Sequence, residues 1–204
     1  MMSFNDIRIY LPKYLSEEST GSLFNELSQF PNNIDSRIYS LAAARENAKF
    51  LQGDGIKGIP TINLPDNQIR PSNVVIISNS CDIDSDNHRL FTSSVCYCPI
   101  YNLEKYRETL RRKLDSSAYP RIDQLIADIR SQRITQIFFL PRGASLEYEG
   151  FIFFDRICSF DNASLPHNPI NDIRLFSLSN YGFYLFLFKL SIHFTRIREC
   201  IDRP

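Results

Sequence analysis

The chain has 204 residues, a formal net charge of zero and 43% hydrophobic residues, and its 13% aromatic content comes from Phe and Tyr, since there is no Trp. This length suits one domain, which buries roughly 70% of its unfolded surface and needs no disulfide or metal to stabilise it. Neutral charge excludes a surface that is basic throughout, although a local basic patch is compatible with it.

The five cysteines are odd in number and contain no CxxC pair; they are Cys81, Cys96, Cys98, Cys158 and Cys200. We interpret them as reduced thiols and predict neither a metal site nor a cofactor. The first residues lack a signal-peptide pattern. No apolar run reaches the roughly 18 residues that a membrane helix requires. We therefore expect a cytoplasmic protein without a membrane partner.

The first 50 residues predict a short strand followed by two helices. Residues 5–15 alternate loosely and stop at Pro12, as a strand does. Ser16 precedes two glutamates and can cap a helix that ends near residue 30. A second helix is expected over residues 36–50 because it contains three successive alanines.

The middle of the chain predicts strands with a helical insertion. Glycines and prolines punctuate residues 52–73, which indicates β-structure with tight turns. The apolar run 74–77 opens the expected central strand over 74–78, and residues 89–99 are expected to form the next one. Helices are expected over 102–113 and 121–130, and strands over 136–140 and 150–157.

The remainder predicts a loop, then either a short strand or the lead into a helix over 174–178, and a last helix over 180–201. Strands in two groups, with helices between them and at both ends, define an α+β fold around a small, curved or closed sheet. We expect one domain over 1–204: strand and helices to residue 50, a core over 51–160 with a helical insertion at about 102–131, and then the C-terminal loop and helix.

Two short motifs resemble the MazF/PemK family of toxin barrels. Arg70-Pro71 leads into an apolar strand that ends in Ser78-Asn79, and a second strand ends in Cys98-Pro99-Ile100. The resemblance covers about 35 residues. It implies an SH3-like antiparallel barrel that cleaves single-stranded RNA without metal, using an arginine and a threonine. Arg70 matches the arginine, whereas Tyr101 stands at the position of the threonine.

This resemblance implies a toxin- or defence-type accessory protein whose partner is single-stranded RNA, a second protein or another copy of itself. RNA cleavage is in question because tyrosine replaces threonine. We expect Arg70 and Tyr101 to take part in the site.

Polar and titratable side chains follow the central strand and form a second candidate site. They are Ser78, Asn79, Ser80, Cys81, Asp82, Asp84, Asp86 and His88. Cys81 with His88 has the outline of a nucleophile and base, so a hydrolase using Cys81, Asp82 and Asp84 is one alternative. The aspartates also have part of a calcium-loop spacing, without its glycine and glutamate. The third alternative is a turn in which these groups bond to the backbone.

Two further features bear on partners. Arg107 and Arg111 lie with Arg112 and Lys113 on one predicted helix, which is either a solvated face or a phosphate-binding surface. The C-terminal helix carries aromatic residues on more than one face, so part of it either lies in the core or contacts a partner. A non-catalytic assembly module is therefore an alternative function.

Overall fold

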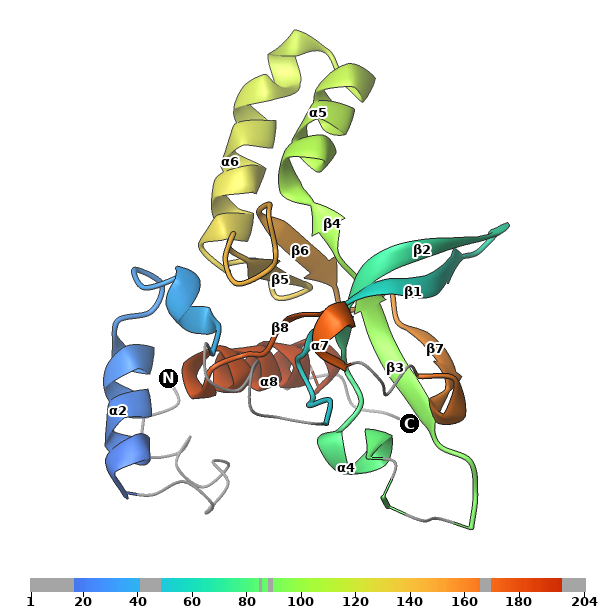
Figure 1. Cartoon of the computed structure of the whole chain (residues 1–204). Coiled ribbons are helices and arrows are strands. Elements are labelled where there is room, and N and C mark those ends of the chain that lie inside the picture. The colour runs from blue at the N-terminus through green and yellow to red at the C-terminus, as the bar shows by residue number, and fades with distance from the viewer. Residues whose placement is uncertain (1–16, 41–48, 85, 88–89, 166–169, 196–204) are drawn as a thin grey trace, which may run out of the picture.

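The computed structural model describes residues 17–40, 49–84, 86–87, 90–165 and 170–195 (Figure 1). They form helices and two antiparallel sheets, which confirms the predicted α+β class. The strand expected within residues 5–15 lies outside the described residues. Among the described helices, none combines the length and apolar character needed to cross a membrane.

The first sheet has five strands in the order β7-β3-β2-β1-β8. Their bounds are β1 (Gly55–Asn63), β2 (Asp66–Ile76), β3 (Ser94–Pro99), β7 (Cys158–Asp161) and β8 (Arg174–Phe176). The stretch predicted to be rich in β-structure and the predicted central strand thus belong to one long hairpin. Its inner half pairs with β3 and β8, and its outer half projects from the sheet (Figure 1).

The second sheet has three strands in the order β4-β6-β5. They are β4 (Tyr101–Asn102), β5 (Ile137–Leu140) and β6 (Gly150–Phe153). Ile100 alone separates β3 from β4, so the chain passes directly from one sheet into the other. The described strands do not close into a barrel.

Alternating apolar side chains explain how the two sheets share one interior. Val74 and Ile76 face a core on one side of β2, whereas Val75 faces a second core on the other. In β5, Phe138 lies in that second core and Phe139 lies in a third. Strands buried on both faces contain continuous apolar runs, because successive side chains point to opposite faces.

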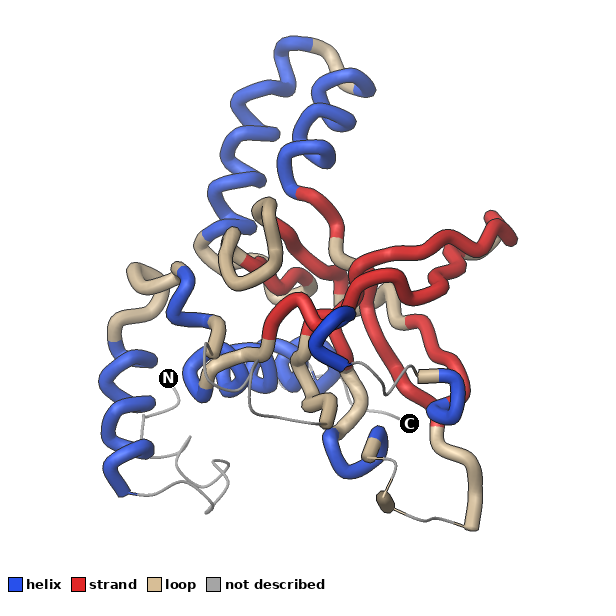
Figure 2. Tube along the Cα trace, in the orientation of Figure 1, coloured by secondary structure: helices blue, strands red, loops and turns tan. Residues whose placement is uncertain are grey.

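Helices cover the outer surfaces of these cores (Figures 1 and 2). The bounds of the longer helices are α2 (Glu17–Ser28), α5 (Leu103–Lys113), α6 (Tyr119–Arg130) and α8 (Asn180–Thr195). The α5–α6 hairpin packs on the second sheet, and α8 packs on the core between the sheets. The short helices are α4 (Ser80–Ile83), α7 (Ile170–Ile173), η1 (Ser36–Ile38), η2 (Ser116–Ala118) and η3 (Asn162–Ser164).

The helix expected over residues 36–50 is wrong at the described positions. Only η1 is helical, and Tyr39 is extended and bridges to Leu178. The Tyr39 hydroxyl donates to the Pro141 carbonyl at 2.6 Å, and its ring lies 4.7 Å from the ring of Phe176. Tertiary contacts of this buried tyrosine outweigh a modest local helix preference. The alanine run, residues 42–44, lies outside the described residues.

Three smaller differences concern the strands: two have shorter bounds than expected, and one was not predicted. The strand expected over 89–99 begins only at Ser94, and the one expected over 150–157 ends at Phe153. A strand not predicted from the sequence, β7, follows a turn and pairs with β3 through Tyr97 and Cys158.

Candidate functional site

The end of the central strand is a turn built from its own polar groups. The Asn79 side chain accepts a hydrogen bond from the Cys81 amide at 3.0 Å and caps α4. The Ser78 hydroxyl accepts one from the Cys96 amide at 2.7 Å. Ile83, 2% exposed, anchors the short helix in the core. Asx and serine side chains close turns in this way.

Lys49 holds the acidic part of this turn. Its ammonium group lies 2.9 Å from Asp84 and 2.7 Å from Asp86. Cys81 is exposed, and His88, its expected base, lies outside the described residues. Within the described ranges, no group of three His, Cys, Asp or Glu side chains is arranged to hold a metal ion. These contacts support the interpretation of Asn79 to Asp86 as a structural turn.

Arg70 lies on the outer, exposed half of β2. Its guanidinium donates to Gln68 at 2.5 Å and lies 3.5 Å from Asp66, and both of these residues belong to the same strand. Over the described parts of the chain, no hydrogen bond or ion pair joins Arg70 to Tyr101. The two residues belong to different sheets, although Val74 and Pro99 of their neighbouring segments are paired.

Tyr101 lies where the chain enters the second sheet, and it belongs to an aromatic platform, defined here as Tyr101, Tyr106 and Phe153 with Arg156 above them. The Tyr101 ring lies 5.6 Å from that of Phe153, and Tyr106 lies 6.3 Å from Phe153. All three rings are half-buried. They come from β4, the first turns of α5, and β6.

Arg156 completes this surface. Its guanidinium carbon lies 4.3 Å from the centre of the Phe153 ring and 5.2 Å from that of Tyr101. One of its nitrogens donates to the Tyr101 hydroxyl at 3.2 Å. Arg156 is exposed, so a charged, planar group lies over aromatic rings at the surface. Such cation–π contacts are stabilising by about 0.5–1 kcal/mol at exposed sites.

Sequence reasoning did not find Phe153 or Arg156 as site residues. Only the aromatic strand 150–154 followed by Asp155-Arg156 signals them in the sequence. Nothing in that pattern shows that Tyr101, about 50 residues earlier, pairs with Phe151 in the neighbouring strand.

Arg107 and Arg111 lie between α5 and α6. A nitrogen of Arg111 lies 2.8 Å from Asp123, and its guanidinium stacks on Tyr119 at 5.0 Å. Arg107 lies 3.5 Å from Glu104 and 3.8 Å from Asp123. Both arginines therefore pair with carboxylates of the helical hairpin, and their first role is to join its two helices.

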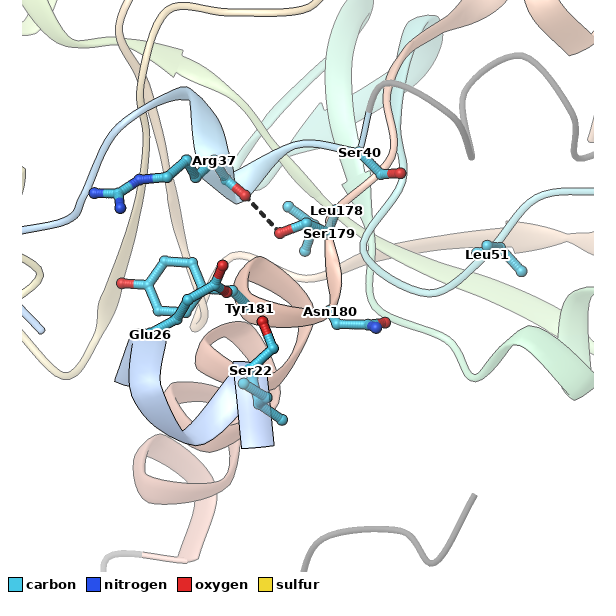
Figure 3. A pocket seen from close by; sticks show the side chains of 10 residues that line it. Ser22, Glu26, Arg37, Ser40, Leu51, Leu178, Ser179, Asn180 and Tyr181 are labelled. Atoms are coloured by element: carbon cyan, nitrogen blue, oxygen red, sulfur yellow. Dashed lines mark hydrogen bonds between the residues drawn. The ribbon is translucent and has the colours of Figure 1, made fainter. Parts of the chain in front are cut away.

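An open depression of about 550 Å³ lies beside the first turn of α8 (Figure 3). Its polar lining includes Ser179, whose hydroxyl donates to the Arg37 carbonyl at 2.6 Å and accepts from the Gly182 amide at 3.1 Å. The Arg37 side chain points away from the depression, as Figure 3 shows, and pairs with Asp35. The serine therefore serves to cap the helix.

Comparison with known protein families finds no family model that matches this chain, and no curated protein matches it in sequence.

Proposed function

We propose that this protein binds single-stranded RNA on the aromatic platform. The observation that carries the proposal is the exposed Arg156 guanidinium, which lies over the Phe153 ring and donates to the Tyr101 hydroxyl. Aromatic faces and arginine planes stack on bases, and each stacked base is worth about 1–3 kcal/mol. An arginine at the same surface also supplies a charge for a phosphate.

We further propose that the five-stranded sheet is an opened form of an SH3-like barrel. The Tyr97 hydroxyl donates to the Pro60 carbonyl, and Cys158 lies 3.3 Å from the Ile62 carbonyl oxygen. In the sheet order β3 is two strands from β1 and β7 is three strands from it, so these contacts mean that the sheet is strongly curved. The curvature and the motif at Arg70 support the MazF/PemK resemblance and, with it, a toxin- or defence-type role.

RNA cleavage by the mechanism of that family is not part of this proposal. It needs an arginine and a hydroxyl acting on one phosphate, whereas Arg70 is engaged with Asp66 and Gln68 on its own strand. Tyr101 is engaged with Arg156. The two groups thus have separate partners, and binding without cleavage fits their contacts better.

Fluorescence anisotropy with a labelled twelve-residue oligouridine tests the proposal at low salt. We expect wild-type protein to bind and Arg156→Gln to weaken binding about tenfold, since it removes both the cation and the stack. Arg142→Gln is the matched control, because Arg142 is also exposed but lies in the turn after β5. Absence of wild-type binding, or equal affinity in Arg156→Gln, overturns the proposal. Gel analysis with and without chelator detects any cleavage.

A second candidate function is self-assembly through α8. Three large apolar side chains of this helix are exposed: Phe188 by 49%, Ile192 by 37% and Phe194 by 58%. Exposed apolar side chains gathered on one helix mark contact surfaces. Light scattering should then show an oligomer that Phe188→Ser with Phe194→Ser converts to monomer. A monomeric wild type at high concentration contradicts this function.

A further inference from the structure

The α5–α6 hairpin ends in basic side chains without carboxylate partners. Residues 109–122 contain four basic residues and one acidic residue, Asp115. Arg111 is engaged with Asp123, but the other three are exposed. No carboxylate of the described residues lies within 4.0 Å of their charged groups. These three residues are called the tip cluster: Arg112, Lys113 and Arg121.

Two arginines at the base of the hairpin and just beyond it do have carboxylate partners. Arg130 lies 2.6 Å from Glu149, and Arg133 lies 3.5 Å from Asp128. Pairing therefore stops where the hairpin reaches its tip. Cations in the last turn of a helix interact favourably with the helix dipole, and this explains the positions of Arg112 and Lys113 at the end of α5. It does not account for Arg121, which lies in the first turn of α6, where the dipole disfavours a cation.

The tip cluster lies about one helix length from Tyr101 of the aromatic platform. Asn102 alone separates Tyr101 from α5, and the 11 residues of α5 span about 16 Å. The base of the hairpin packs on the second sheet, and its far end projects away from both sheets, with the tip as the most distant part (Figure 1). A separation of about 16 Å corresponds to roughly five phosphates at about 3.4 Å each along a stacked strand.

We propose that the tip cluster binds phosphates of the same RNA strand whose bases stack on the aromatic platform. This inference rests on the proposed function and names a second contact for it. Lysine and arginine neutralise phosphates without reading bases, so the tip adds affinity and salt dependence but no sequence preference. The hairpin thereby serves as an arm that lengthens the bound RNA segment.

The tip chemistry favours RNA over an anionic membrane. Helices that bind at a membrane surface present a broad apolar face with their cations. Here the apolar side of the hairpin is buried on β5 and β6, in a core that includes Ile122, Ile126 and Phe139. Leu114, 48% exposed, is the large apolar side chain left exposed at the tip. One such side chain does not make an apolar face.

Anisotropy titrations with labelled oligouridines of four and sixteen residues, over a range of salt concentrations, test the inference. The variant replaces the three cations of the tip cluster with glutamine. For the long oligomer, the slope of log K against log salt should become shallower by about 2, since each phosphate contact on a single strand contributes about 0.7. The four-residue oligomer, held at the platform alone, should bind both proteins equally.

Arg142→Gln serves as the control and should leave both titrations unchanged. An unchanged slope in the tip variant, while Arg156→Gln still weakens binding, overturns the tip inference and leaves the proposed function standing. Failure of wild type to bind either oligomer overturns both. If the tip variant loses binding to phosphatidylserine vesicles while its RNA binding is unchanged, the tip inference is also overturned. Thermal unfolding of the variant verifies that it folds, which is expected because all three residues are exposed.

Discussion

The ammonium group of Lys189 lies 2.8 Å from the backbone oxygen of Gln132 and 2.9 Å from its side-chain oxygen. A third contact, at 2.9 Å, reaches the Ile134 carbonyl. Lys189 is only 5% exposed, and all three acceptors are uncharged. The side-chain amide of Gln132 donates to the Phe139 carbonyl and accepts from the Phe139 backbone N–H. Lys189 therefore joins α8 to the connection between α6 and β5.

The first prediction concerns pH. Burial lowers the pKa of Lys189 from its ordinary value to about 7. Between pH 7 and about 10, the unfolded chain therefore binds more protons at this residue than the folded protein does. Stability then rises with pH across this window, by up to about 1.4 kcal/mol per pH unit. Denaturant unfolding at pH 7.5 and 9 should show this rise in wild type but not in Lys189→Met.

Lys105→Met is the control for that experiment, because Lys105 is exposed on α5 and should keep the wild-type pH dependence. If Lys189→Met retains the same rise, the buried ammonium is not its source.

The second prediction concerns a buried ion pair. Arg174 and Asp54 lie 3.2 Å apart, with each side chain 1% exposed, and Arg174 also bonds to the Lys49 carbonyl. Arg174→Met leaves a buried carboxylate without its cation and should cost about 3–5 kcal/mol. Adding Asp54→Leu should recover much of this loss, since no charge is then buried alone. Urea unfolding measures both; a double variant as unstable as the sum of the single ones contradicts the prediction.

The third prediction compares two glycines in helices. A Cβ on Gly182 would lie 2.2 Å from the Ile38 carbonyl oxygen, where α8 crosses η1. Gly182→Ala must therefore push this helix away and should cost about 2 kcal/mol or more. Gly21 in α2 has no atom within 4 Å of such a Cβ. Gly21→Ala should stabilise the protein by about 0.5–1 kcal/mol. Opposite shifts in melting temperature are expected, and shifts of one sign would count against this packing.

The fourth prediction concerns the turn after β2. Asn79→Ala removes the cap of α4 and should cost about 1 kcal/mol. Cys81→Ala should change stability by less than about 0.5 kcal/mol, because the thiol is exposed. Neither change should alter RNA affinity by more than the loss of folded protein explains. If the protein hydrolyses a substrate and Cys81→Ala abolishes that hydrolysis without loss of folded protein, the hydrolase alternative is restored.

Periodicity was enough to predict the elements whose apolar pattern is strong. The stripes of α5 and α6 identified two helices within a few residues of their observed bounds, whereas the apolar run 74–77 identified only the inner end of β2, which begins at Asp66. The helix expected over 36–50 is wrong at Tyr39 because a distant contact, to Pro141, decides its backbone. The barrel and the RNA role remain proposals that rest on curvature and on the platform.

For the site, the sequence by itself indicated a polar turn after the central strand and pointed to Tyr101. Local hydrogen bonding explains the first, since asparagine and serine bond to amides within a few residues of themselves. Only the tertiary structure decided that Tyr101 lies beside Phe153 and under Arg156, and that Arg70 lies apart from it on a projecting hairpin. Contacts between residues some 50 positions apart depend on strand order, which local side-chain patterns do not encode.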